Sequence, residues 1–176
     1  MAKMNNERDS ITADRLKELV SYDAETGVFR RLTRTTRQSP GDVAGNAKGS
    51  AGYIRFRVDG LECHAHRLAW LYAYGVWPSK HIDHIDGNPS NNALSNLREA
   101  SDGENAQNQW RASKRNRVGL LGVSWHKCGF WRARIAVGRK SKTIGYFHTP
   151  EMAHAAYMNA KRDMHPFGTI AQVSHG

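Results

Sequence analysis

Apolar residues in the first part of the chain recur at spacings that predict two helices. An apolar residue at every third or fourth position predicts a short amphipathic helix over residues 12–20, with Ser10 or Thr12 as its N-cap. The stretch 65–75 is richer in leucine, alanine and aromatic residues, and it stops at Gly75, a common helix terminator. We therefore expect an amphipathic helix near the start and a buried helix later.

Alternating apolar and polar residues between these helices predict strands. Residues 39–52 are rich in glycine, serine and alanine, and they are expected to form a loop. Asp59-Gly60 is a turn signal of the hairpin type. The strands predicted in this part of the chain are 28–32, 53–58 and 61–64.

The pattern changes near Ser113, where a short basic segment without an apolar period leads into residues that alternate as strands do. We place a module boundary there. A helix is expected to start at Thr149 or Pro150 and to pack on the sheet. The predicted strands are 122–125, 131–137 and 142–147, and the helix residues expected to face them are Ala153, Ala156, Tyr157 and Ala160.

The chain carries a strong excess of basic residues. Its 26 Lys and Arg against 16 Asp and Glu give a formal net charge of +10 and a pI near 9.9. Such a field attracts polyanions, so nucleic acid is the first partner to consider. The most apolar stretch, 68–76, is far shorter than the roughly 20 residues of a bilayer span, and membrane insertion is not expected. Residues 1–10 lack the apolar region of a secretion signal, which predicts a cytoplasmic protein.

The first part of the chain forms a basic arm. Asp42 is the sole acidic residue between positions 29 and 58. Two interpretations stay open, a solvated surface or a set of phosphate contacts. The basic residues are Arg30, Arg31, Arg34, Arg37, Lys48, Arg55 and Arg57, of which Arg55 and Arg57 are candidate DNA contacts.

Groups suited to acid–base and metal chemistry crowd the segment 81–88, which we expect to end a strand. A short extended piece follows at 96–100. A helix is expected after it, because Ser101 and Glu104 have the spacing of a capping box. The carboxylate, imidazole and amide groups that these elements bring together are Asp83, His84, Asn96 and Asn105.

This set of groups suits phosphodiester hydrolysis. The reaction needs a base to activate water and a hard cation to stabilise charge on the phosphate oxygens. Oxygen donors such as Asp83 and the side-chain carbonyl of Asn105 match Mg²⁺. An asparagine opposite His84 would fix the tautomer of a general base.

Several motifs between residues 65 and 109 keep fixed distances from one another. They are His66-Arg67-Leu68-Ala69-Trp70, Trp77-Pro78, the run from Ile82 to Asn88, Asn91-Asn92 and Asn96-Leu97-Arg98. Together they resemble the phage-type HNH homing endonucleases. The resemblance implies a ββα-metal fold in which His84 is the general base and Asn96 orients its imidazole. It further implies that Asp83 and Asn105 bind one divalent cation, Mg²⁺ or Mn²⁺, and that cleavage leaves a 5′-phosphate and a 3′-hydroxyl.

A second set of motifs lies between residues 119 and 168. It consists of Gly122-Val123, Trp131-Arg132-Ala133, Ile144-Gly145-Tyr146-Phe147 and the run from Ala153 to Ala160. These motifs resemble the AP2 DNA-binding domain, which docks a three-stranded sheet in the major groove. The resemblance implies that the DNA contacts come from Trp125, Lys127, Arg132, Arg134 and Lys142. A solvated sheet face is the alternative interpretation.

We therefore expect an α+β protein with a ββα-metal nuclease core and a C-terminal three-stranded antiparallel sheet plus helix of the AP2 type. The predicted organisation is an N-terminal helix and basic β arm at 1–64, an HNH core at 65–112, a basic linker at 113–118 and an AP2-like domain at 119–176.

The predicted function is site-directed cleavage of double-stranded DNA by a homing-type endonuclease, without a small-molecule cofactor. Monomer and homodimer stay open. One alternative is a DNA-binding regulator of the transcription-factor type with an inactive nuclease core. Another is an RNA-binding structural protein, which would leave the HNH spacing without an explanation.

Overall fold

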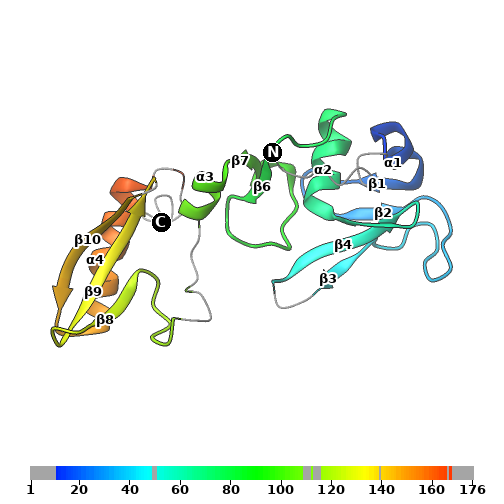
Figure 1. Cartoon of the computed structure of the whole chain (residues 1–176). Helices are drawn as coiled ribbons and strands as arrows, with labels where there is room; N and C mark the ends of the chain where they lie inside the picture. Colours follow the sequence, from blue (N-terminus) through cyan, green and yellow to red (C-terminus); the bar gives the residue numbers. More distant parts are fainter. Residues whose placement is uncertain are drawn as a thin grey trace. The chain divides into compact units, whose positions relative to one another are not determined.

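The computed structural model describes residues 11–48, 51–108, 112, 116–138, 140–165 and 167 (Figure 1). The chain forms two compact units that divide after Ala100. The predicted linker at 113–118 falls in the second unit, and its residues 113–115 lie outside the described residues.

Short helices and antiparallel strands make up the first unit. The strands pair as β1-β2, β3-β4-β5 and β6-β7. The elements in chain order are α1 Ala13–Leu19, β1 Val20–Tyr22, β2 Phe29–Arg31, β3 Asn46–Lys48, β4 Tyr53–Val58, β5 Leu61–His64, α2 Ala65–Tyr74, β6 His81–His84, the 3-10 turn η2 Leu94–Asn96 and β7 Leu97–Ala100.

Local signals in the sequence locate both predicted helices of this unit correctly. The Thr12 side chain accepts a hydrogen bond from the backbone N–H of Arg15 and caps α1. Gly75 ends α2 with a φ of 78°. The predicted hairpin turn is also confirmed, because Asp59 and Gly60 both have positive φ, 46° and 83°.

The predicted loop 39–52 is wrong in one part, because it contains strand β3. This strand pairs with β4 in antiparallel register, with Asn46 opposite Arg55 and Lys48 opposite Tyr53. Its hydrogen bonds come from the partner strand, so the glycine- and serine-rich composition of the segment gives no signal of it.

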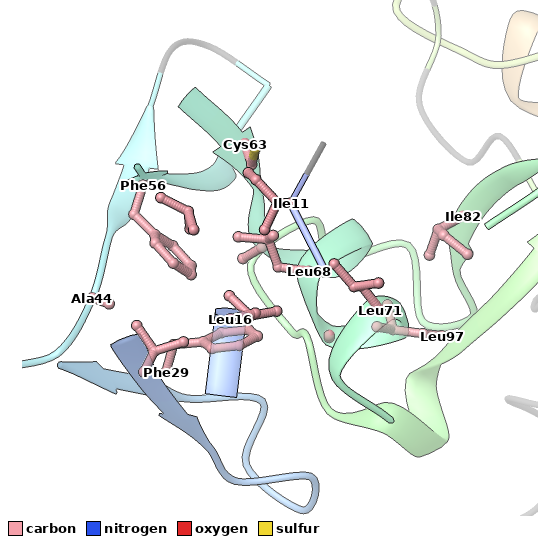
Figure 2. Packing of buried hydrophobic residues seen from close by; sticks show 14 residues of the cluster. Ile11, Leu16, Phe29, Ala44, Phe56, Cys63, Leu68, Leu71, Ile82 and Leu97 are labelled. Carbon is pink, nitrogen blue, oxygen red and sulfur yellow. The ribbon is translucent and has the colours of Figure 1, made fainter. Parts of the chain in front are cut away.

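One hydrophobic core joins the elements of the first unit (Figure 2). Leu16 of α1 and Leu68 of α2 are fully buried in it. Residues before and after position 65 therefore pack as one body, so the predicted basic arm shares its core with the segment that carries Asp83 and His84. The buried members are Ile11, Leu16, Val20, Phe29, Ala44, Phe56, Val58, Cys63, Ala65, Leu68, Ala69, Leu71, Ile82 and Leu97.

The second unit contains the predicted three-stranded antiparallel sheet and its helix. The strands lie in the order β10-β9-β8, and α4 lies along one face of the sheet (Figure 1). Thr149 caps α4 as predicted. The elements are α3 Asp102–Gln107, β8 Val123–His126, β9 Phe130–Val137, β10 Lys140–Phe147 and α4 Pro150–Met164. A second core contains Val123, Ala133, Ile135, Ala153 and Tyr157.

Gly122 offers a test of this second core. Its φ is +76°, and a Cβ there would lie 2.0 Å from Cδ2 of Tyr157. We expect Gly122→Ala to lower the free energy of unfolding by about 2–4 kcal/mol, because positive φ and overpacking both oppose a side chain. Hydrogen exchange of the β9 amides measures the effect on this unit.

Gly119→Ala is the matched control, because Gly119 also has positive φ, +74°, but has no atom within 4 Å of a built Cβ. It should cost about 1 kcal/mol. Equal losses in the two variants would contradict the packing of Gly122 on Tyr157.

Candidate active site

The antiparallel pair β6-β7 carries the two reactive residues that the sequence places together. Asp83 lies opposite Arg98, and His84 lies opposite Leu97. Consecutive residues of a strand leave opposite faces. Asp83 and His84 are 7% and 5% exposed, and each has its own surroundings. The side chains therefore do not form one cluster at the strand end; they occupy the two faces of β6.

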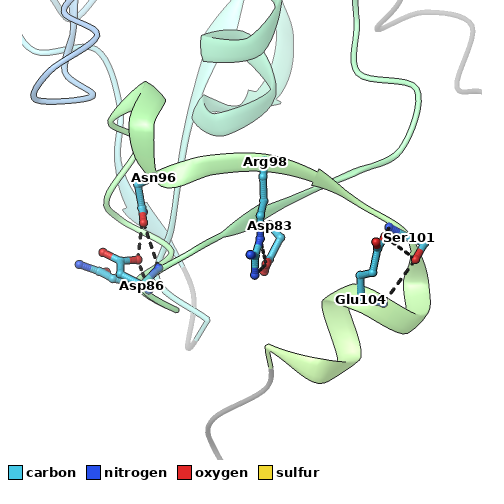
Figure 3. Close-up of polar contacts among 7 residues, drawn as sticks. Asp83, Asp86, Asn96, Arg98, Ser101 and Glu104 are labelled. Carbon is cyan, nitrogen blue, oxygen red and sulfur yellow. Dashed lines mark hydrogen bonds and ion pairs between the residues drawn. The ribbon is translucent and has the colours of Figure 1, made fainter. Parts of the chain in front are cut away.

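Asp83 forms an ion pair with Arg98 across the two strands (Figure 3). Nε and Nη2 of Arg98 donate to Oδ2 of Asp83 at 3.1 and 2.9 Å. A buried carboxylate requires a compensating charge, and the guanidinium supplies it. The pair fixes the position of Asp83 at this end of the sheet.

His84 is held by an amide. Its Nε2 lies 3.2 Å from Oδ1 of Asn92. The amide nitrogen of Asn92 donates to the carbonyl oxygen of Ser90 at 3.3 Å, so the amide oxygen faces the ring. This orientation assigns the ring proton to Nε2 and the basic lone pair to Nδ1. Burial lowers the pKa of His84, although the Asn92 hydrogen bond and the nearby carboxylates raise it.

The loop between β6 and β7 is closed by hydrogen bonds that centre on Asn96 and Asp86 (Figure 3). Asn96 Nδ2 donates to Asp86 Oδ1 at 2.9 Å and to the carbonyl oxygen of Asn91 at 2.8 Å. Asn96 Oδ1 accepts from the backbone N–H of Asp86 at 2.9 Å. Burial raises the pKa of Asp86, but hydrogen bonds from Asn88, Asn91 and Asn96 outweigh it and hold the pKa below its ordinary value.

The N-terminal part of the first unit braces the same loop. Tyr22 Oη donates to the carbonyl oxygen of Asn92 at 2.8 Å. The backbone N–H of Leu94 donates to the carbonyl oxygen of Ala24 at 2.9 Å. Gly27 approaches so closely that a Cβ there would lie 2.2 Å from the carbonyl carbon of Asn92. Asn92 is therefore fixed by residues far from it in the sequence.

Three further rings cluster with His84. The centroid of His66 lies 5.1 Å from that of His84, with the rings nearly perpendicular at 86°. Tyr53 lies 5.8 Å from His84, and His64 lies 5.1 Å from His66. Burial, with the neighbouring His84 and His64, lowers the pKa of His66 to about 2. His66 is therefore neutral in any ordinary buffer.

Comparison with known proteins identifies the family. Residues 63–107, which include β6, the loop and β7, match the family model described as HNH endonuclease. Protein 3.8 of Escherichia phage T7 is 37% identical over 102 residues, which are 57% of this chain and 83% of the relative. The chain belongs to the HNH endonuclease family. Comparison with solved structures gives no significant match.

The amide that meets the imidazole in this HNH protein is Asn92, whereas the family resemblance assigns the orienting role to Asn96. The side chain of Asn96 is engaged with Asp86 and Asn91 instead. Asn96 also accepts a backbone hydrogen bond from Ile85, at 2.8 Å, next to His84. The sequence shows Asn92 only as part of the Asn91-Asn92 motif, and its burial, at 1% exposure, is known only from the fold.

The second proposed metal ligand of the HNH site, Asn105, lies on α3 in the second unit. The capping box of this helix is confirmed, because the backbone N–H of Glu104 donates to Ser101 Oγ at 3.4 Å and the backbone N–H of Ser101 donates to Glu104 Oε2 at 2.8 Å (Figure 3). Within the described ranges, no group of three or more His, Cys, Asp and Glu side chains is arranged to hold a metal ion. Asp83 and Asn105 offer oxygen donors, which fit Mg²⁺ because it keeps several waters and takes few protein ligands.

Arg132 and Arg134 share the open face of the second sheet. Their neighbours Ala133 and Ile135 are buried on the side of α4, and alternate residues of a strand leave opposite faces. Ser124 on β8 lies directly opposite Arg132. The face away from α4 therefore carries both arginines, as the alternation in the sequence predicts.

Trp125 and Lys142 lie on the other side of this sheet. Trp125 is paired with Trp131, which packs against the core under α4, and paired residues leave the same face. Lys142 is paired with the buried Ile135. Lys127 is exposed in the turn between β8 and β9. The arginines and Trp125, expected on one surface, thus lie on two faces of the sheet. Trp125 follows the buried Val123 by two residues, so both side chains leave β8 on the α4 side.

Arg55 and Arg57 share one face of β4, opposite the buried Phe56 and Val58. Arg55 lies opposite His64 on β5, so this face adjoins the cluster of rings around His84.

No helix in the described part of the chain is long and apolar enough to cross a membrane.

Asp86→Asn tests the closure of the loop. The pKa of Asp86 is lower in the folded protein than its unfolded value, which is about 3.9. Its contribution to stability is therefore present above pH ~4 and is lost as the pH falls through the folded-state pKa. We expect Asp86→Asn to lower the free energy of unfolding at pH ~7, and we expect this difference from wild type to shrink as the pH falls below ~4.

Urea unfolding of both proteins across this pH range measures the difference. Asp163→Asn, on the exposed part of α4, is the carboxylate control and should show no such loss. A destabilisation by Asp86→Asn that is equal at both ends of the range would contradict the ionised carboxylate at the centre of the loop.

Proposed function

We propose that this protein is a site-directed DNA endonuclease of the phage homing type that hydrolyses a phosphodiester bond with His84 as the general base. The observation that carries the proposal is a buried His84 held by Asn92, on the strand that also carries Asp83, inside the segment matched to the HNH family. The phage origin of the related Protein 3.8 supports action on DNA in an infected bacterial cell.

His84 suits the role of base because it keeps its lone pair at neutral pH. Burial lowers its pKa, and Asn92 holds the proton on Nε2. Nδ1 then takes a proton from a water molecule. The water oxygen forms a bond to phosphorus, and the bond from phosphorus to the 3′ oxygen breaks. Solvent supplies the proton of the leaving 3′-hydroxyl, His84 returns its proton to solvent, and the phosphate stays on the 5′ end.

Asp83 and Asn105 would hold one divalent cation, Mg²⁺ or Mn²⁺. When bound, the cation would supply positive charge for the oxygens of the scissile phosphate. Arg98 holds the Asp83 carboxylate in place within the sheet through their ion pair. Asn96 acts through the loop, since its hydrogen bonds to Asp86 and Asn91 determine where Asn92 stands.

Recognition of duplex DNA would come from the second unit and from the basic face of the first. The half-buried Arg132 and the exposed Arg134 share the open face of an AP2-like sheet, where arginine can read guanine edges or bind phosphates. Arg55 and Arg57 lie on the face beside the His84 cluster and would bind the DNA backbone there.

One observation favours a second function, a DNA-binding regulator with an inactive nuclease core. Two nitrogen atoms of Arg98 donate to Asp83, and an ion pair of this kind can also have a purely structural role. Cleavage separates the two functions, because a regulator binds the site and leaves it intact.

His84→Ala should abolish cleavage while DNA binding stays nearly intact, because the change removes the base and leaves the basic faces in place. The measurement is nicking or cutting of a mixed library of supercoiled phage and bacterial DNA with Mg²⁺, with Mn²⁺ and with chelator. Wild type should cut at a few sites only in the presence of metal. The loss in His84→Ala should be at least about 100-fold.

His81→Ala is the control for this variant, since His81 is an exposed histidine of the same strand. It should cleave as wild type does. Tight binding of a site without cleavage by wild type would support the regulator, and equal cleavage by wild type and His84→Ala would exclude His84 as the base.

Arg132→Ala with Arg134→Ala should weaken DNA binding at least about tenfold and reduce its dependence on salt, because charged contacts to DNA release counterions. Fluorescence anisotropy in the His84→Ala background measures this without cleavage. Lys142→Ala removes a charge from the α4 side of the same sheet and should have a smaller effect. A larger loss of DNA affinity in Lys142→Ala than in the double arginine variant would show that the α4 side faces the DNA.

A further inference from the structure

The open face of the second sheet carries an aromatic side chain to which the proposed function gives no task. Tyr146 of β10 is 49% exposed. It lies directly opposite Arg132 of β9, so both side chains leave the same face of the sheet. On its other side, Arg132 lies opposite Ser124 of β8. Ser124, Arg132 and Tyr146 therefore form one row across the three strands.

Neighbouring side chains restrict the orientation of Tyr146. The centroid of its ring lies 5.0 Å from that of His126 on β8, with the rings at 62° to each other. Because β8 and β10 flank β9, the two rings approach each other across the strand that carries Arg132. Arg132 is half-buried in this row, and its Nη2 donates to Ser124 Oγ at 3.5 Å. Tyr146 is thus an exposed ring held beside a guanidinium.

The charge of this part of the chain indicates the kind of partner. Between Asn105 and Pro150 the sequence has ten Lys or Arg residues and no Asp or Glu. A face formed by such a segment complements the phosphates of a nucleic acid. Tyrosine and arginine are also enriched in binding interfaces relative to the rest of a protein surface. The face therefore fits duplex DNA, and Tyr146 adds an apolar contact that charge alone does not supply.

The chemistry of the major groove indicates what this ring contacts. The base edges there present hydrogen-bond donors and acceptors, and their one apolar group is the C5-methyl of thymine. An aromatic ring gains free energy when it removes that methyl group from water. Residues opposite each other on neighbouring strands have Cβ atoms about 4.5–5.5 Å apart, and successive bases are roughly 3.4 Å apart. Tyr146 therefore reaches the base pair beside Arg132 or the next one.

We propose that Tyr146 is a specificity-determining residue that contacts the methyl group of a thymine in the major groove, next to the DNA contact of Arg132. This role rests on the proposed recognition of duplex DNA by the open face. It adds a preference for one base at a position that the arginines do not read. His126 acts through Tyr146, since its ring limits the orientations that the tyrosine adopts.

Replacing thymine by deoxyuridine tests the contact, because it removes only the methyl group. Selection from a randomised duplex pool with the full-length His84→Ala protein yields bound sites without cleavage. Each thymine of a selected site is then replaced in turn, and affinity is measured by fluorescence anisotropy. At one position the replacement should lower affinity about fourfold, the value of one buried methylene-sized group.

Tyr146→Ala, added to the His84→Ala protein, should abolish this fourfold difference between thymine and deoxyuridine. The four affinities form a double-mutant cycle that isolates the contact of the ring with the methyl group. Tyr146→Phe should keep the difference, because the ring remains. Tyr74→Ala is the matched control, since Tyr74 is an exposed tyrosine of α2 in the first unit, at 54% exposure, and this variant should also keep it.

Two results would overturn the role of Tyr146. One is a set of selected sites in which no thymine is sensitive to the loss of its methyl group, a result that needs no variant of Tyr146. The other is a loss of affinity in Tyr146→Ala that is equal for thymine and deoxyuridine, because the ring would then serve the fold or stack on a base without reading the methyl group.

The double variant Arg132→Ala with Arg134→Ala keeps this failure distinct from failure of the proposed function. If the double variant weakens binding while methyl sensitivity persists in Tyr146→Ala, only the role of Tyr146 is overturned. If neither change affects binding, recognition of DNA by the open face is wrong and the role of Tyr146 with it. Cleavage does not enter these measurements, so an inactive nuclease would count only against the proposed hydrolysis.

Discussion

The hydrogen bonds between Asn96 and Asp86 are the constraint on which the rest of the site depends. They tie the two ends of the β6-β7 loop together, with both atoms of the Asn96 amide in use. Asn92 lies inside this closed loop, and its amide oxygen meets the imidazole of His84. A site whose reactive ring is held by a loop amide needs a loop of one fixed shape, and the hydrogen bonds between these amide and carboxylate groups supply it.

The two faces of β6 divide the chemistry between them. On one face, Asp83 forms an ion pair with Arg98. On the other, burial lowers the pKa of His84 and favours its uncharged form, although the hydrogen bond to Asn92 raises the pKa. This separation permits a carboxylate and a base to be neighbours in sequence without an ion pair between them, since direct pairing would raise the pKa of the imidazole and consume its lone pair.

Local signals made much of the fold predictable from the sequence. Caps at Thr12, Ser101 and Thr149 and the terminator Gly75 mark helix ends, and the alternation in β9 locates a strand with its arginines on one face. Long-range relations were not predictable. Strand β3 depends on its partner β4, and the side of the sheet on which Trp125 lies depends on its pairing with Trp131. The contact of Asn92 with His84 became visible only when the loop was folded, because burial has no signature in spacing.

The close approach of Gly27 to the backbone of Asn92 has a consequence for how this nuclease can be inherited and recombined. The segment matched to the family begins at residue 63, yet the loop that holds the reactive histidine rests on Tyr22, Ala24 and Gly27. A recombination event that transferred only the matched segment would leave its loop without this support. The matched segment alone is therefore not a portable nuclease, and substitutions at position 27 are expected to be as restricted as those at the residues of the site themselves.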